Sequence, residues 1–313
     1  MHDREAKLKF WQSVAFVDTD QLLALARLSD GLGYHGMMVS DHVFFPRELD
    51  SSYPYSPTGK PMWDSSAPWP DPWVLIGALA AATSNLRFST NIYVAPARHP
   101  FVVAKAVSTA AVLSGNRVAL GVGAGWMREE FDAMGQDFSN RGARLEEMIP
   151  LLRRLWEGGM VEHHGRHYDF ASLEMSPAPT LPVPIYGGGQ SPAALRRAAR
   201  LCNGWIGNAY PVDDAFDWVR RVRKERDDVA GRAEPFEIIL GVMAMPDPDL
   251  LKRLEDAGVT GVLCAPWLSH SVTAGPESSA RADIPVDPAS RRSYSARAQA
   301  VEKFAELVIE RMA

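Results

Sequence analysis

Four short stretches of this sequence carry side chains or glycines that could serve chemistry. The first is Ser40-Asp41-His42, where a carboxylate stands beside an imidazole. Such a pair can exchange protons near neutral pH. The alternative is an aspartate that caps its own loop beside a surface histidine. The residue types alone leave both interpretations open.

The second stretch is Thr90-Asn91-Ile92-Tyr93. Asparagine is disfavoured inside strands, so Asn91 suggests a bulge in the chain. An ordinary strand with one inward polar residue fits the same letters. These two interpretations also remain open on the residues alone.

The other two stretches are rich in glycine: Gly121-Val122-Gly123-Ala124-Gly125-Trp126 and Gly187-Gly188-Gly189-Gln190-Ser191-Pro192. Closely spaced glycines let main-chain N–H groups approach an anion, and a helix that begins there favours negative charge. Either stretch could instead be a tight structural turn. Two such loops in one chain indicate phosphate binding more specifically than either loop alone.

The elements that must position these residues follow a simple alternation of strand-like and helix-like runs. We expect strands at 8–17, 36–40, 86–94, 117–122, 182–186, 204–207, 236–245 and 259–264. Eight such units predict an α/β fold, a (β/α)8 TIM barrel forming a single domain over 1–313. The active site of such a barrel lies at the carboxyl ends of its strands, where all four stretches fall.

Two insertions interrupt the alternation. Residues 43–70, after the second strand, are long and irregular enough to form a lid, and a helix and small hairpin follow the fourth strand. Of Trp63, Trp69 and Trp73, which could line a lid, we expect packing roles. Asp18 with Gln21 resembles a capping box, and 266–292 is expected to be an irregular loop.

Composition excludes several classes of protein. The net charge is −5, with 33 basic and 38 acidic residues interspersed, which predicts neither a nucleic-acid nor a membrane surface. The N-terminal residues lack an apolar signal core, and Cys202 and Cys264 are expected to be reduced thiols in a cytoplasmic protein. His163, His164 and His167 lack a carboxylate pattern that would complete a metal site, so no metal is expected.

Several motifs together resemble the luciferase-like flavin and deazaflavin oxidoreductases over roughly residues 10–262. The motifs are NRVALGVGAGWMREEF at 116–131, RGARLEE at 141–147, HGRHY at 164–168, and PIYGGG at 184–189 leading to Gly204-Trp205. They are most similar to the subgroup that uses the deazaflavin coenzyme F420.

The resemblance implies a barrel with the coenzyme ring at its mouth, backed by a non-proline cis bond at Asn91–Ile92. It implies that His42 and Asp41 lie near the reactive edge of the ring, with Asp41 orienting His42 as proton donor. The residues implied to contact the coenzyme are Asn91, Ile92, Gly123, Ala124, Gly125, Trp126, Gly187, Gly188, Gly189 and Ser191.

One departure from the pattern bears on the substrate. Relatives that oxidise sugar phosphates carry a glutamate where this chain has Trp126. We therefore expect a more apolar substrate. The expected function is hydride transfer between F420 and a small carbonyl, imine or activated alkene.

Two other functions fit the same motifs. One is an FMN-dependent monooxygenase of the bacterial-luciferase type, supplied by a separate coenzyme reductase. The other is a non-catalytic flavin carrier or sensor. The resemblance also implies a homodimer.

Overall fold

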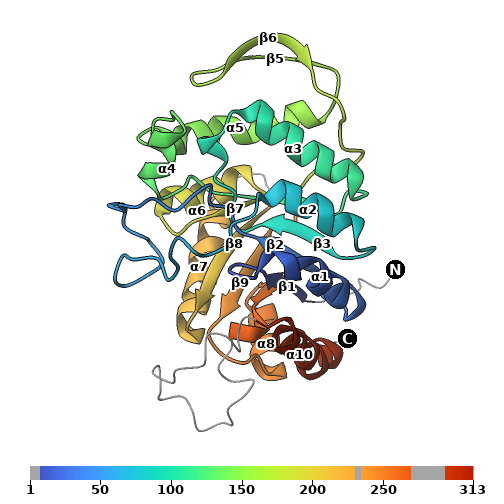
Figure 1. Ribbon diagram of the computed structural model, residues 1–313. Coiled ribbons are helices and arrows are strands. Elements are labelled where there is room, and N and C mark those ends of the chain that lie inside the picture. The colour runs from blue at the N-terminus through green and yellow to red at the C-terminus, as the bar shows by residue number, and fades with distance from the viewer. Residues whose placement is uncertain (1–7, 230–233, 269–292, 313) are drawn as a thin grey trace.

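Eight parallel strands close into a barrel in the order β1-β10-β9-β8-β7-β4-β3-β2 (Figure 1). The structure is a computed structural model that describes residues 8–229, 234–268 and 293–312. The barrel strands are β1 (Lys9–Ser13), β2 (Gly36–Val39), β3 (Arg87–Thr90), β4 (Val118–Val122), β7 (Ile185–Gly188), β8 (Gly204–Tyr210), β9 (Glu237–Val242) and β10 (Gly261–Cys264). The predicted TIM barrel is confirmed.

The strands are apolar on both faces because one face lines the barrel and the other meets the helices. Met38 and Ile239 belong to the cluster inside the barrel, while their neighbours Met37 and Ile238 pack in the larger cluster beneath the helices. This explains why the strands appear in the sequence as continuous apolar runs.

Helices surround the barrel (Figure 1). They are α1 (Leu22–Gly31), α2 (Pro72–Ala81), α3 (Pro100–Leu113), α5 (Arg141–Trp156), α6 (Pro192–Leu201), α7 (Val212–Asp227), α8 (Pro248–Asp256) and α10 (Tyr294–Phe304). Within the described residues, no helix is both long and apolar enough to cross a bilayer.

Several helix starts follow their predicted signals. Asp71, Ser191 and Asp247 each accept a hydrogen bond from a main-chain N–H of the helix that follows, with proline at its first position. The predicted capping box at Asp18 is wrong. Its carboxylate makes no cap bond and instead accepts a hydrogen bond from Arg297 at 2.9 Å, which ties the start of α1 to α10.

The insertions depart from the barrel where expected. Residues 43–70 form an irregular loop between β2 and α2, and the segment after β4 contains α4 (Arg128–Ala133), α5 and the hairpin of β5 (Met160–His164) and β6 (Asp169–Glu174). The hairpin stands outside the barrel, beyond α5 in Figure 1. Of the loop expected at 266–292, the short helical turn η3 (Pro266–Leu268) is described, and the rest lies outside the described residues.

The third strand is shorter than predicted. It ends at Thr90, and the Asn91–Ile92 peptide bond just beyond its end is cis. The sixth barrel strand, β8, is longer than predicted, with an irregular register between Ile206 and Ala209. Both differences lie at the carboxyl ends of strands, where the chain forms the mouth of the barrel.

Candidate active site at the barrel mouth

Asp41 lies just after β2 and is almost completely buried, with 1% of its side chain exposed. Its two oxygens accept hydrogen bonds from the Arg98 guanidinium at 2.7 and 2.8 Å, and one also accepts from the N–H of Val94 at 2.9 Å. Burial raises the pKa of the Asp41 carboxyl, and the Arg98 charge opposes this shift. The prediction that Asp41 orients His42 is wrong. Asp41 instead holds the segment that follows β3.

His42 has a different carboxylate partner. Its Nδ1 lies 3.2 Å from both carboxylate oxygens of Glu130, which lies in the first turn of α4 and is 3% exposed. One of these oxygens also accepts the N–H of Val43 at 2.7 Å. An ionised carboxylate only accepts hydrogen bonds, so this contact places the hydrogen on Nδ1 and leaves Nε2 for a ligand.

Sequence reasoning did not single out Glu130. It is the second glutamate of the MREEF segment that follows the glycine loop of β4. The available signal was its position, since an acidic residue in the first helical turn after a strand end points toward the mouth of a barrel.

The bulge at the end of β3 is built around the cis bond at Asn91–Ile92, as expected. The Asn91 N–H donates to Val39 at 2.7 Å, and the Tyr93 N–H donates to Gly121 at 2.8 Å, so β2 and β4 hold the bulge from both sides. The predicted bulge is confirmed, and the N–H groups of Asn91 and Tyr93 are satisfied by the neighbouring strands.

The Ile92 side chain explains two of the glycines. A Cβ atom at Gly123 would lie 2.9 Å from Ile92, and one at Gly188 would lie 2.6 Å from it. Gly187 has a different role, because its Cβ would lie 2.7 Å from Ala198 on α6. These three glycines therefore make room for the bulge and for a close helix, whatever ligand binds beside them.

The remaining parts of the two glycine loops present main-chain donors. Gly125 and Gly189 have φ values of +85° and +106°, a region that favours glycine. Among the residues that the structure describes, no hydrogen bond uses the N–H groups of Ala124, Gly125 or Trp126, nor those of Gln190 or Ser191. Unused N–H groups beside a helix start fit an anionic group such as a phosphate. The loops thus meet the requirement for a phosphorylated coenzyme.

The insert 43–70 reaches over the mouth and is fastened to α4. Glu129 accepts the N–H groups of Asp50 and Ser51 at 2.8 and 3.0 Å, and the Arg128 N–H donates to the Ser51 hydroxyl at 2.9 Å. Burial and the neighbouring Tyr210 at the end of β8 raise the pKa of Tyr55 above its ordinary value. The insert therefore extends from β2 as far as β8.

Trp63 and Trp69 of the insert stand over the imidazole of His42, at centroid distances of 5.4 and 4.9 Å. Trp126 from the β4 loop approaches the same ring at 5.7 Å. Trp73 is different, because it packs in α2 against Tyr93. The packing interpretation holds for Trp73, whereas the other tryptophans surround the candidate catalytic histidine.

The histidines of the hairpin have local partners. His163 lies 3.1 Å from Glu147 and His164 lies 2.6 Å from Asp169, while the His167 N–H donates to Glu147. Glu147 thereby fastens the hairpin to α5. No group of three potential metal ligands occurs among the described residues.

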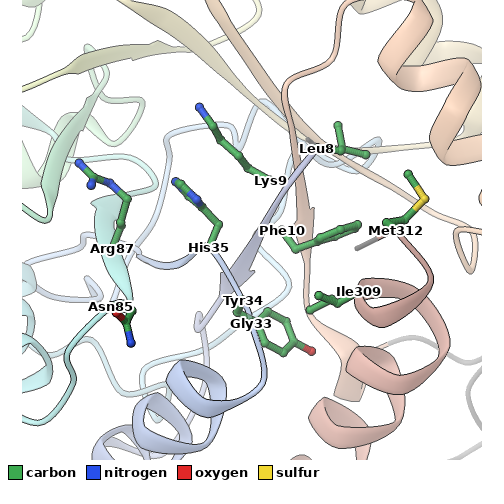
Figure 2. A pocket seen from close by; sticks show the side chains of 10 residues that line it. All are labelled: Leu8, Lys9, Phe10, Gly33, Tyr34, His35, Asn85, Arg87, Ile309 and Met312. Atoms are coloured by element: carbon green, nitrogen blue, oxygen red, sulfur yellow. The ribbon is translucent and has the colours of Figure 1, made fainter. Parts of the chain in front are cut away.

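A separate cavity of about 440 Å³ lies at the opposite end of the barrel (Figure 2). Lys9, His35 and Arg87 line one side of it, at or near the amino ends of β1, β2 and β3. Burial, followed by the charges of Lys9 and Arg87, lowers the pKa of His35 to about 4. In TIM barrels the amino ends of the strands contribute to stability and the active site lies at their carboxyl ends, so this cavity is not part of the candidate active site.

The fold and the mouth together define a TIM barrel with two glycine loops and a bulged third strand around the His42–Glu130 pair. The chain belongs to the luciferase-like monooxygenase family, whose sequence pattern matches residues 9–309. The uncharacterized protein Rv0940c of Mycobacterium tuberculosis is 40% identical over 82% of this chain and 88% of its own length. The F420-dependent glucose-6-phosphate dehydrogenase of Amycolatopsis mediterranei is 28% identical over 87% and 79%.

Solved structures share the fold at low identity. The monooxygenase RslO1 from Streptomyces bottropensis has a TM-score of 0.71 and 16% identity, covering 98% of this chain and all of its own. The coenzyme F420-dependent tetrahydromethanopterin reductase from Methanopyrus kandleri has a TM-score of 0.68 with the same identity and coverage. The family match and the F420-dependent dehydrogenase relative make the protein an enzyme of the oxidoreductase or monooxygenase type.

Proposed function

We propose that this enzyme is an F420-dependent oxidoreductase that transfers a hydride between the deazaflavin and a small organic substrate. The observation that carries the proposal is the convergence at one barrel mouth of two loops with unused N–H groups and the His42–Glu130 pair. The 28% identity to an F420-dependent dehydrogenase supports the choice of coenzyme.

The chain's own residues would divide the work as follows. The N–H groups at 124–126 and 190–191 would bind the coenzyme phosphate, and the Asn91–Ile92 bulge would support the ring. The bound deazaflavin supplies hydride chemistry. The Nε2 atom of His42 would give a proton to the substrate or take one from it, while Glu130 holds the imidazole through Nδ1.

The coenzyme assignment is tested by titrating the purified protein with F420 and with FMN. We expect F420 to bind with micromolar affinity or better. At 100 times its dissociation constant it should stabilise the fold by about 2.7 kcal/mol, which a melting curve detects. Tighter binding of FMN, with oxygen uptake when reduced FMN is supplied, would replace the proposal with a two-component monooxygenase. Failure of both coenzymes to bind would end it.

The phosphate loop is tested by Ser191→Asp. Aspartate keeps the helix cap but adds a negative charge beside the proposed phosphate, so the affinity for F420 should fall about fourfold to tenfold. Ser293→Asp is the matched control, because Ser293 caps α10 through the same contact. Equal affinity in the two variants would contradict the assignment of the phosphate to this loop.

The role of Glu130 is tested by Glu130→Gln. Glutamine replaces the charged acceptor of His42 by a neutral amide and so removes most of a hydrogen bond worth about 1.5–3 kcal/mol. Turnover should therefore fall roughly 10- to 150-fold with F420 affinity unchanged. Glu129→Gln is the neighbouring control, because Glu129 binds the insert rather than His42. If the two variants lose turnover equally, the pair has no specific role in catalysis.

A further inference from the structure

Five aromatic side chains from three separate parts of the chain form one cluster, which we name the aromatic cage, and its three tryptophans contact His42. They are Phe16, Tyr53, Trp63, Trp69 and Trp126. Phe16 lies 5.6 and 5.4 Å from the rings of Trp63 and Trp69, and Tyr53 lies 4.9 and 5.1 Å from those of Trp63 and Trp126. Phe16 lies in a turn and has a φ of +64°, a conformation that a bulky residue rarely adopts.

The indole N–H groups of Trp63 and Trp69 are buried and have no hydrogen-bond acceptor among the described residues. Buried donors are nearly always satisfied, so two such groups side by side indicate an acceptor from outside the chain. Trp11 and Trp73 also lack an acceptor, but these residues are only 2% and 6% exposed and lie in the packed interior. Trp63 and Trp69 are only partly buried, so a ligand that moves the insert can reach them.

The charged groups beside the cage already have partners. Asp41 is bound to Arg98, and Glu130 is bound to His42. The cation–π contacts found among the described residues all involve rings outside the cage. In the part of the chain that the structure describes, no arginine stacks on the cage to receive a phosphate or carboxylate, and the indole N–H groups favour a hydrogen-bond acceptor over a positively charged ligand.

We infer that the substrate is a flat, uncharged, conjugated carbonyl compound of one or two fused rings. This rests on the proposed function. The ring system lies against the indoles of the cage, and its oxygen atoms accept hydrogen bonds from Trp63 and Trp69. The indoles now pack on each other at 5.4 Å, and 9% of the His42 side chain is exposed. The substrate therefore enters by separating the insert from His42.

The corresponding reaction is a two-electron reduction of the carbon–carbon double bond conjugated to the carbonyl. The reduced deazaflavin, when bound, would supply a hydride to the carbon β to the carbonyl. The imidazolium form of His42 would give its Nε2 proton to the α carbon and keep the Nδ1 hydrogen bond to Glu130. The double bond becomes single, the coenzyme is oxidised, and His42 is reprotonated from water.

The inference is tested by calorimetric titration with chromone, a planar uncharged compound with a conjugated carbonyl, in coenzyme-free and F420-saturated protein. The control compound is 2-nonanone, which also has nine carbons and a carbonyl group but is a flexible chain rather than a planar ring system. We expect micromolar binding of chromone and at least tenfold weaker binding of 2-nonanone. Trp63→Phe and Trp69→Phe keep a ring but remove the N–H, so each should weaken chromone binding about fivefold.

Trp218→Phe, on the outer helix α7, is the control and should leave the affinity for chromone unchanged. Equal binding of the two probes, or chromone affinity unaffected by both cage variants, would overturn the inference. F420 titration of the same samples keeps the two proposals apart. Retained F420 binding with no chromone binding refutes the substrate class alone, and loss of F420 binding refutes the proposed function.

Discussion

The buried pair of Asp41 and Arg98 gives the sharpest prediction about the mouth of the barrel. The structure assigns Asp41 to holding the chain after the bulge, through Arg98 and the Val94 N–H, and not to orienting His42. We consider Asp41→Asn, Arg98→Met and the double variant. Together they form a double-mutant cycle.

The magnitude follows from burial. Only 1% of the Asp41 side chain and 11% of the Arg98 side chain is exposed, so either partner left alone is a poorly solvated charge. Removing one partner of such a pair costs about 3–5 kcal/mol of unfolding free energy. The double variant removes both charges, so its loss should be smaller than the sum of the single losses by about 2 kcal/mol or more.

The two single variants should differ. In Asp41→Asn the amide oxygen can still accept the Val94 N–H, and Arg98 keeps its contact with the Tyr93 ring at 4.3 Å. In Arg98→Met the Asp41 carboxylate has no compensating charge. Arg98→Met should therefore be the more destabilising change, near the upper end of that range.

Stability should also depend on pH in Arg98→Met. Burial already raises the pKa of Asp41, and removing Arg98 raises it further. A carboxyl whose pKa is higher in the folded than in the unfolded state binds more protons when folded. The contribution of Asp41 to the stability of this variant should therefore be largest below the unfolded pKa of about 3.9 and should be lost as pH rises toward the folded pKa.

The assay is equilibrium urea unfolding of the four proteins between pH 4 and 8, with F420 titration of each. If the unfolding free energy lost in the double variant equals the sum of the losses in the two single variants, Asp41 and Arg98 do not stabilise each other. A full loss of turnover in Asp41→Asn with stability and coenzyme affinity unchanged would also refute the account of the pair, because that result would return Asp41 to a direct role beside His42.

Two further predictions concern parts of the fold that hold the mouth and the hairpin. Gly121→Ala should prevent stable folding, because its Cβ would lie 1.8 Å from the main-chain oxygen of Thr90. Gly77→Ala in α2 is the control, because a Cβ there meets nothing within 4 Å, and it should stabilise the protein by up to about 1 kcal/mol in thermal unfolding. Equal yields of the two folded variants would contradict this. Burial raises the pKa of Glu147, but hydrogen bonds from His163 and the hairpin main chain outweigh it, so the net pKa is lowered. The hairpin contact should therefore stabilise the protein above the unfolded pKa of about 4.3 and lose its effect as pH falls through the folded value. Urea unfolding from pH 7 to 3 should show a smaller acid-side loss in Glu147→Gln, and identical slopes would count against the contact.

The barrel could be predicted from the sequence because its signals are local. Proline after a capping residue at Asp71, Ser191 and Asp247 fixed helix starts that the structure reproduces. Strand boundaries were less accurate where glycine is frequent. The strand predicted at 182–186 is observed at Ile185–Gly188, because Gly187 packs against Ala198 rather than forming a turn.

The partners of the site residues were not predictable, because they depend on long-range packing. Asp41 meets Arg98 across the bulge, and His42 meets a carboxylate that lies 88 positions later in the chain. Adjacency in the sequence suggested that Asp41 orients His42. Neighbouring residues at a strand end point in different directions, so they can serve different partners.

Two neighbouring glutamates of α4 hold the first part of the insert, next to β2, in place. Glu130 binds Val43, and Glu129 binds Asp50 and Ser51. The stretch between these attachments is held in place together with His42, whereas residues 52–70 extend beyond the second attachment and carry Tyr53, Trp63 and Trp69. Exchange of that outer portion between members of the family would alter which molecules are accepted while leaving the proton-transfer group where it stands. Substrate choice and chemistry can thus diverge separately within one loop.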